Sequence, residues 1–296
     1  MTDRAVVALL GASSLVGTRV RAMLREQARP VMAYSRHVRT AVAETGETWR
    51  TVGAAAAVAT PAVPPVGDWL CVAPIWVLPQ HFAMMQAHGV RRLVALSSTS
   101  RFTKQPSAGA ADPAEHAVAV QLAQGEEQLR VWAEANSVAW TILRPTLIYG
   151  LGLDKNVSEI ARFVGRFGFF PVFGSGNGKR QPVHADDVAR ACLAAFDNPA
   201  CTNQAYNLSG GETLAYSDMV RRVFAALRRP QRLVTLPLAV FRLAIALLRL
   251  IPRYRNWSPA MAARMEKDLV FDHSEAARDL GFSPRPFLLT RQDLPA

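Results

Sequence analysis

The stretch AVVALLGASSLVG, residues 5–17, decides the fold. Its apolar half predicts a buried strand, and helix-like sequence follows the turn directly. A dinucleotide-binding turn needs one glycine for its bend, small residues where the backbone approaches the pyrophosphate, and a last glycine where the helix packs closely. Gly11 and Gly17 meet the first and last needs, and Ser14 stands where a middle glycine is usual. We therefore predict that this turn and helix start hold a phosphate through Gly11, Ser13, Ser14, Leu15, Val16 and Gly17.

The end of the second predicted strand favours NADP over NAD. Ser35 and Arg36 stand where an acidic residue would bind the ribose hydroxyls of NAD. An arginine at this position suits a 2′-phosphate instead, and Arg39 is close by in sequence. The competing interpretation of Arg36 is a solvated surface arginine in an arginine-rich chain.

Short apolar runs alternate with helix-like segments through the first half of the chain, which is typical of βαβ units around a parallel sheet. The predicted strands are Ala5–Leu10, Val31–Tyr34, Trp69–Ala73, Leu93–Leu96 and Trp140–Leu143, and the predicted helices are Val16–Gln27, Pro79–His88 and Ala114–Asn136. The sequence thus predicts an α/β protein with a Rossmann-type doubly wound parallel sheet and a small C-terminal α/β substrate lobe. Residues 1–150 would form the sheet, with 185–210 returning to it, and the lobe would comprise 151–184 and 211–296.

Composition limits the partners. Of 34 basic residues against 23 acidic ones only four are lysines, so arginine supplies most of the net charge of +11, which favours an anionic partner. Arg221-Arg222 and Arg228-Arg229 have no aromatic platform or helix-turn-helix pattern beside them, so we expect no nucleic-acid partner. Three cysteines without metal-ligand spacing, and histidines without zinc spacing, predict no metal site and a cytoplasmic location.

One apolar segment raises the question of a membrane. In Pro237–Ile251, 12 of 15 residues are apolar, but Arg242 and Arg249 interrupt the run, which is too short to span a bilayer. The segment predicts either a core-packing helix with two arginines that extend to solvent, or an interfacial helix at the inner face of a membrane.

Five segments together resemble the short-chain dehydrogenase/reductase superfamily, in its extended and atypical branches of NAD-dependent epimerase/dehydratase-like proteins. They are the Gly11–Gly17 turn, VRRLVALSS at 90–98, LRPTLIYG at 143–150, RQPVHADD at 180–187 and YNLSGGETL at 206–214. The resemblance implies an NAD(P) cofactor, and Arg36 favours NADP(H) over NAD(H). The resemblance also implies further cofactor contacts at two strand ends, from Ala73, Pro74, Pro145 and Thr146.

The catalytic pair of that superfamily is absent. Its enzymes use a Ser or Thr, matched here by Ser98, and a Tyr-x-x-x-Lys pair in which the lysine lowers the pKa of the tyrosine that transfers the proton. None of the five tyrosines has a lysine four residues later. Aligning on Gly125-Glu126-Glu127 places Val118 and Leu122 at the two positions, and a one-residue slip gives Ala119 and Ala123. The usual proton transfer therefore does not carry over to this chain.

Other polar residues are candidates near this position. Lys104 and His116 are each a possible acid, although a lone residue of either kind is more often solvated. Tyr149 belongs to a loop that lines the nicotinamide in relatives, so it is a possible substrate contact or else a packing residue. Arg180 stands four residues before His184, where nucleotide-sugar epimerases of the family hold a substrate diphosphate. The alternative is a surface arginine beside a helix capped by Asp186 or Asp187.

Three functions remain open from the sequence. The first is an NADP-dependent oxidoreductase, epimerase or dehydratase with atypical proton transfer, and the second is a non-catalytic NADP(H)-binding sensor or accessory protein. The third is a peripheral membrane protein that handles an isoprenoid or lipid-linked substrate, based on the segment 237–251. In the first case the partner is a small molecule, anionic or lipid-linked. The missing pair favours the second function, and the retained Ser98 and Arg180 favour the first.

Overall fold

The structure is a computed structural model that describes residues 5–36, 46–52, 65–103, 113–236 and 265–295. The predicted segment 237–251, Lys104 and Arg39 lie outside these residues. Among the described residues, no helix has the length and apolar character needed to cross a membrane.

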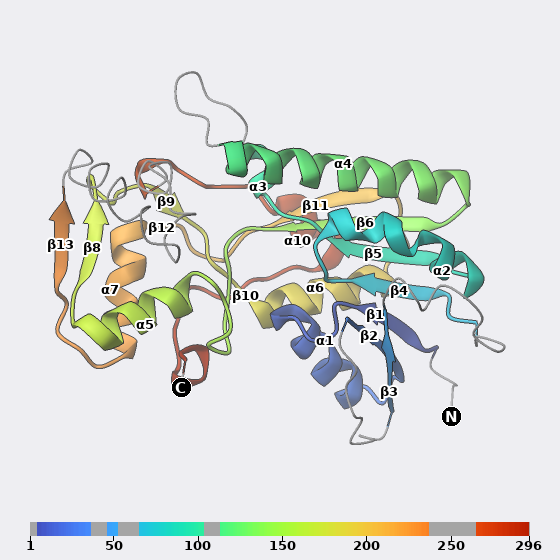
Figure 1. Cartoon of the computed structure of the whole chain (residues 1–296), viewed down its shortest axis with the longest axis horizontal. Coiled ribbons are helices and arrows are strands. Elements are labelled where there is room, and N and C mark those ends of the chain that lie inside the picture. The colour runs from blue at the N-terminus through green and yellow to red at the C-terminus, as the bar shows by residue number, and fades with distance from the viewer. Residues whose placement is uncertain (1–4, 37–45, 53–64, 104–112, 237–264, 296) are drawn as a thin grey trace.

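A seven-stranded sheet forms the centre of the molecule, in the order β11-β6-β5-β4-β1-β2-β3 (Figure 1). Every neighbouring pair in it is parallel, which confirms the predicted Rossmann-type sheet. The chain runs outward from β1 through β2 to β3, then returns to β4 on the other side of β1. Its strands are β1 (Val7–Leu10), β2 (Val31–Ser35), β3 (Glu47–Thr51), β4 (Asp68–Cys71), β5 (Arg92–Leu96), β6 (Ala139–Pro145) and β11 (Gln204–Leu208).

Helices cover both faces of the sheet (Figure 1). On one face lie the 3-10 helix η1 (Ile75–His81), α2 (Phe82–Ala87) and α4 (Pro113–Ala135), packed on Ala8, Leu10 and their neighbours. On the other lie α1 (Leu15–Glu26), α6 (Ala185–Asp197) and α10 (Ser274–Leu280), packed on Val7, Leu9 and their neighbours. Because successive strand residues point to opposite faces, the unbroken apolar runs of the sequence supply both cores.

A smaller lobe stands beside the sheet, at the left of Figure 1. It has its own apolar core, which includes Tyr149, Val164, Val172, Phe224 and Phe287. In the described part of the chain, three two-stranded pairs lie outside the central sheet, namely β10 with β7, β12 with β9 and β13 with β8. The elements concerned are β7 (Ile148–Tyr149), α5 (Val157–Phe167), β8 (Phe170–Phe173), β9 (Lys179–Arg180), β10 (Val183–His184), β12 (Leu214–Ala215), α7 (Tyr216–Ala226) and β13 (Leu233–Leu236).

Two parts of the structure differ from the sequence-based expectation: the strand β3 and residues 274–282. The charged strand β3, with the sequence ETWRT, has no apolar run, because it is the outermost strand and only partly buried. Residues 274–282, predicted within the lobe, pack through Ala276, Leu280 and Phe282 against the core beside α6 and β11. The remaining short elements are α3 (Ser100–Thr103), η2 (Pro199–Cys201) and η4 (Arg291–Asp293).

Candidate functional site

The residues predicted to bind a cofactor meet at one edge of the sheet. Gly11 follows β1, Arg36 follows β2, Ala73 follows β4, Ser98 follows β5 and Thr146 follows β6. Since these strands are parallel, their carboxyl ends share one edge, and β1 and β4 flank the point where the strand order reverses. Open α/β sheets bind ligands in this position.

Gly11 and Gly17 are both required by close backbone contacts. Gly11 has a φ of +87°, and a Cβ at this position would stand 2.5 Å from the backbone nitrogen of Ala73. At Gly17, a Cβ would stand 2.4 Å from the carbonyl oxygen of Gly11. The turn therefore packs closely between the start of α1 and the loop after β4. Such close packing is expected of a turn that presents its backbone N–H groups to a phosphate.

Ser14 is the N-cap of α1. Its Oγ accepts a hydrogen bond from the backbone N–H of Gly17 at 3.1 Å, which leaves the hydroxyl proton to donate to an anion. The first turn of α1 contains no acidic residue that would repel a phosphate. Ser13 is exposed and Leu15 half-buried, whereas the Val16 side chain is buried in the core, so that only its backbone faces the turn. The residues present fit a dinucleotide diphosphate.

Beyond β2 the structure places two arginines, one of which sequence reasoning missed. Arg36 is exposed immediately after the buried Ser35. Arg50 pairs in register with Tyr34 on the neighbouring strand β3, and its Nε is buried with no hydrogen-bond partner in the described part of the chain. A half-buried cation without a partner is unfavourable unless an anion approaches it. An arginine on an edge strand carries no sequence signal for this role.

The serines after β5 serve the local structure. Ser98 Oγ accepts a hydrogen bond from the backbone N–H of Ser100 at 3.1 Å, at the start of α3. Ser97 Oγ donates to Glu126 Oε1 at 2.5 Å. The proton of the Ser98 hydroxyl is thus still available at the sheet edge, and its predicted catalytic role stays a prediction.

A buried charge cluster lies behind these serines. Glu126 on α4 is 3% exposed and accepts hydrogen bonds from Arg144 of β6, at 2.7 Å from Nη2 and 3.0 Å from Nε. Arg101 of α3 also pairs with it. The sequence contained both halves of the ion pair, in Gly125-Glu126-Glu127 and LRPTLIYG, but nothing in it joined them.

The helix face that leads to Glu126 is otherwise apolar. Val118, Leu122 and Glu126 are four residues apart, and so lie on one side of α4. Leu122 is buried in the core against the sheet, and the half-buried Val118 packs beside it. His116 is half-buried, and its Nδ1 is buried without a hydrogen-bond partner among the described residues.

The residues at the strand ends beside the turn differ in their hydrogen bonds and in their burial. Thr146 donates its hydroxyl to the carbonyl of Gln181 at 2.5 Å and its backbone N–H to Leu208 at 3.0 Å. Pro145 is buried, Ala73 is half-buried and Pro74 is exposed. Their contacts with a cofactor stay predictions.

Tyr149 lies in the lobe core rather than on a surface. It is 0% exposed, and its ring packs edge-on against His184 and Phe287, with centroids 5.1 and 4.9 Å away. Burial and the nearby Asp293 carboxylate raise the pKa of Tyr149. In this arrangement Tyr149 is a packing residue of the lobe core. A contact with a substrate would require its side chain to move.

Two hydrogen bonds orient the His184 ring. Its Nδ1 accepts the backbone N–H of Asp186 at 3.0 Å, so the ring proton is on Nε2, which lies 2.9 Å from Asp293 Oδ1. His184 is therefore the N-cap of α6, and the expectation that Asp186 or Asp187 caps this helix was wrong. Both aspartates lie in the first turn and pair with arginines, including Arg19 and Arg285.

Arg180 is also more enclosed than a surface clamp would be. It is 5% exposed, and its Nη1 donates to the carbonyls of Lys179 and Lys267, both at 2.7 Å. Its guanidinium lies 5.6 Å from the centre of the Tyr216 ring. Binding of a diphosphate would have to displace some of these contacts, and the substrate role of Arg180 stays a prediction.

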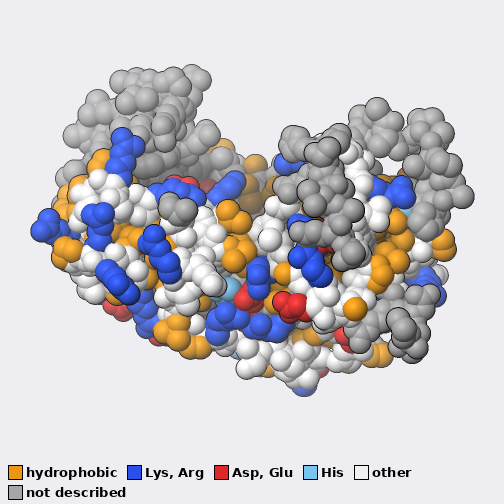
Figure 2. Space-filling view, turned by 90° about the horizontal axis from the view of Figure 1, so that it is seen from below, with side chains coloured by type: hydrophobic (Ala, Val, Ile, Leu, Met, Phe, Trp, Pro, Cys, Tyr) orange, Lys and Arg blue, Asp and Glu red, His pale blue; other side chains and the backbone are white. Residues whose placement is uncertain are grey.

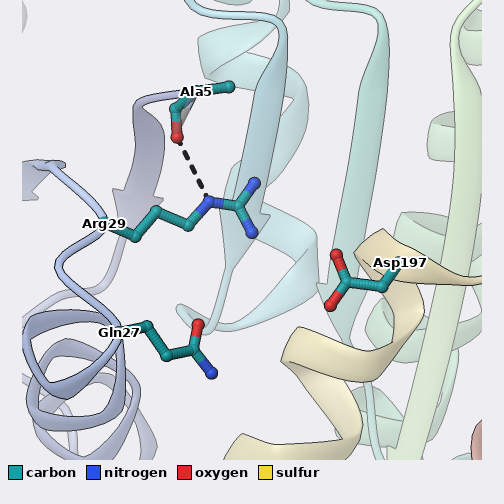
Figure 3. A pocket seen from close by; sticks show the side chains of 4 residues that line it. All are labelled: Ala5, Gln27, Arg29 and Asp197. Atoms are coloured by element: carbon teal, nitrogen blue, oxygen red, sulfur yellow. Dashed lines mark hydrogen bonds between the residues drawn. The ribbon is translucent and has the colours of Figure 1, made fainter. Parts of the chain in front are cut away.

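One pocket lies far from this edge. Ala5, Gln27, Arg29 and Asp197 line it, and Arg29 donates to the carbonyl of Ala5 at 3.1 Å (Figure 3). Ala5 precedes β1, while Gln27 and Asp197 lie at the ends of α1 and α6, so this pocket opens at the amino edge of the sheet. It is separate from the candidate cofactor site.

Comparison with known proteins agrees with the geometry at the carboxyl edge. Residues 81–209 match the family model described as the NAD dependent epimerase/dehydratase family. This part of the chain is therefore similar to the NAD-dependent epimerase/dehydratase family. This confirms the family resemblance of the sequence, and the matched part includes β5, α4, β6 and α6.

Proteins that are similar to the chain in sequence have different functions. The chain is 28% identical over 120 residues to the UDP-glucose 4-epimerase of Vibrio cholerae, covering 40% of this chain and 37% of that protein. It is 32% identical over 101 residues to subunit 9 of the NADH dehydrogenase [ubiquinone] 1 alpha subcomplex, a mitochondrial protein of Arabidopsis thaliana, covering 34% of this chain and 25% of that protein. The matches thus span well under two thirds of either relative.

The fold extends the similarity to almost the whole chain. A UDP-glucuronic acid 4-epimerase from Bacillus cereus, solved in complex with NAD, superposes with a TM-score of 0.70. The alignment covers 94% of this chain and 91% of that one, at 14% sequence identity. At this identity the match shows the shared fold.

Proposed function

We propose that this chain binds NADP(H) at the carboxyl edge of its sheet and functions without the tyrosine–lysine proton transfer of the superfamily. The observation that carries the proposal is Gly11, where the positive φ, and the 2.5 Å that would separate a Cβ from the Ala73 backbone nitrogen, leave no room for any side chain. A turn this tight, which leads into a capped helix N-terminus, is suited to bind a diphosphate.

Two arginines support NADP over NAD. Arg36 is exposed directly after β2, and Arg50 on the adjacent strand has a buried Nε without a partner within the described ranges. A 2′-phosphate would give both guanidiniums an anionic partner. Hydrogen bonds to charged groups contribute about 1.5–3 kcal/mol each, enough to prefer NADPH by at least tenfold.

The nucleotide is proposed as a structural or signalling ligand. The face of α4 that should carry the proton donor and its activator presents Val118 and Leu122, and the next polar group, Glu126, is neutralised by two arginines. A non-catalytic sensor or accessory role fits such a site, and one relative is a subunit of a mitochondrial NADH dehydrogenase.

Calorimetric titration with NADPH and NADH tests the proposal. We expect NADPH to bind at least tenfold more tightly, and Arg36→Ala to lower the ratio of the two affinities by about tenfold. Arg91→Ala is the matched control, because Arg91 is exposed just before β5, at the amino edge of the sheet. Absence of nucleotide binding, or a ratio that Arg36→Ala leaves unchanged, contradicts the proposal.

A second candidate is an NADP-dependent oxidoreductase with atypical proton transfer, acting on an anionic or lipid-linked small molecule. The buried Nδ1 of His116, which has no partner in the described part of the chain, favours it. In this case NADPH consumption with an acceptor would fall in His116→Gln while the affinity for NADPH stayed unchanged. Consumption that persists unchanged in His116→Gln excludes His116 as the acid.

A further inference from the structure

A patch of aromatic and basic side chains covers the outer end of the lobe, away from the cofactor site. We call it the lobe patch and define it by residues of α5, of the turn after α7 and of the β8–β13 pair: Arg166, Phe167, Phe169, Arg228, Arg229, Arg232 and Val234. Backbone bonds hold these segments together, since the N–H of Phe170 donates to the carbonyl of Arg232 at 2.9 Å and β13 pairs with β8.

The apolar part of the patch is exposed although it is anchored in the core. Phe167 is 52% exposed, Phe169 37% and Val234 42%. Gly168, with a φ of +74°, ends α5 between the two phenylalanines and lets their ring centroids come within 6.4 Å of each other. Phe163 packs against both rings from below, at 4.6 and 5.7 Å. The folded lobe thus holds two large apolar side chains in water, which is unfavourable unless something covers them.

The charged part of the patch is basic. Arg166, Arg228, Arg229 and Arg232 are all exposed, and none forms an ion pair with a carboxylate within the described ranges. The nearest acidic side chains on the same helices are neutralised, because Glu159 pairs with Arg162 and Asp218 with Arg221. The Arg166 guanidinium lies 5.2 Å from the centre of the Phe167 ring, so the positive charge directly borders the apolar surface.

Figure 2 shows how these types of side chain gather. At the left end of the molecule, which is the lobe, Lys and Arg side chains lie between hydrophobic ones. Near the middle of the same face, basic and acidic side chains lie next to one another instead.

We propose that the lobe patch binds the surface of an anionic membrane. Basic side chains attract acidic headgroups, and exposed aromatic rings insert at the boundary between headgroups and acyl chains. The rings contact one another in tilted and edge-on arrangements instead of standing apart as separate platforms for bases, which favours a lipid surface over single-stranded nucleic acid.

Vesicle co-sedimentation of the full chain tests the proposal. We expect binding to vesicles of 70:30 phosphatidylcholine and phosphatidylserine but not to pure phosphatidylcholine, and weaker binding as salt rises. Arg229→Gln with Arg232→Gln should weaken binding roughly 25-fold, at about fivefold for each arginine near an anionic surface. The control is Arg91→Gln with Arg291→Gln, which changes the net charge equally at exposed residues outside the patch.

A second pair of variants tests the apolar part. Phe167→Ser with Phe169→Ser should abolish sedimentation with the anionic vesicles, while circular dichroism and NADPH affinity stay as in the wild type. If this variant fails to fold, the arginine pair alone decides. Wild-type protein that does not sediment, patch variants that sediment as well as the wild type, or binding to poly(U) RNA in place of vesicles would each overturn the proposal.

Discussion

Glu126 of α4 and Arg144 of β6 form a two-pronged ion pair, with Glu126 Oε2 2.7 Å from Arg144 Nη2 and Glu126 Oε1 3.0 Å from Arg144 Nε. The pair lies one helical turn beyond Leu122, on the α4 face where the superfamily carries its proton donor. Arg101 also pairs with Glu126, and Ser97 donates to it. The polar group on this face therefore ties α4 to the carboxyl ends of β5 and β6.

Replacing Arg144 by Met should destabilise the fold by about 3 kcal/mol, because it removes the main partner of a buried carboxylate. Urea unfolding measures the change. The double variant Glu126→Leu with Arg144→Met should recover part of this loss, because it also removes the buried carboxylate that Arg144→Met leaves without its main partner. A double variant that is less stable than Arg144→Met would show that the carboxylate is not the source of the effect.

Gly11→Ala should abolish NADPH binding and also lower the melting temperature. The new Cβ would meet the backbone of Ala73 at 2.5 Å, at a φ of +87° that L side chains rarely adopt. Gly89→Ala is the matched control, because Gly89 also has a positive φ but a Cβ there meets nothing within 4 Å. We expect that variant to lose about 1 kcal/mol of stability and to bind NADPH normally. Equal binding by both variants would mean that the turn does not hold the nucleotide.

Arg50→Met should have opposite effects on the free protein and on the complex. Without nucleotide, removing a half-buried guanidinium whose Nε has no partner in the described part of the chain should leave the free energy of unfolding unchanged or raise it slightly. With NADPH, affinity should fall by about tenfold or more, while NADH affinity stays nearly constant. Parallel losses for the two nucleotides would refute a role at the 2′-phosphate.

Asp293 should contribute to acid sensitivity. Burial raises the pKa of this carboxyl, but hydrogen bonds from His184 and Thr290 outweigh it and hold the pKa at about 2. A carboxyl with a lower pKa in the folded than in the unfolded protein stabilises the fold above its unfolded pKa, and this stabilisation is lost as the pH falls toward the folded value. From about pH 4 to pH 2, the wild type should therefore lose more unfolding free energy than Asp293→Asn does. Parallel pH profiles of the two proteins would contradict this.

The sequence predicted the centre of the fold well because buried parallel strands are short apolar runs. Leu93–Leu96 and Trp140–Leu143 both lie within observed strands, and Gly11 marks the observed turn. The edge strand β3 escaped prediction since its residues Glu47 and Arg50 are polar, and Glu47 pairs with arginines of α1. A continuous apolar run indicates a strand that is buried on both faces, and an edge strand such as β3 is not buried in this way.

The candidate site was predictable in its local parts and not in its long-range ones. Gly11 and Arg36 follow strands directly, so a strand prediction places them at the sheet edge. The contacts of Glu126 with Arg144, and of His184 with Asp293, join residues far apart in the chain, and no single-sequence pattern encodes such partners. Arg180 was expected to face a substrate, but only the fold shows that its Nη1 donates to two backbone carbonyls.

A crystal structure of the NADPH complex tests the central claim most directly. We predict the diphosphate on the backbone of the Gly11–Gly17 turn, the 2′-phosphate on Arg36, and the nicotinamide beside Val118 and Leu122, with no side-chain hydrogen-bond donor from α4 near its C4 atom. A nucleotide bound elsewhere, or a donor of α4 such as His116 within hydrogen-bond reach of a group at C4, would contradict the account.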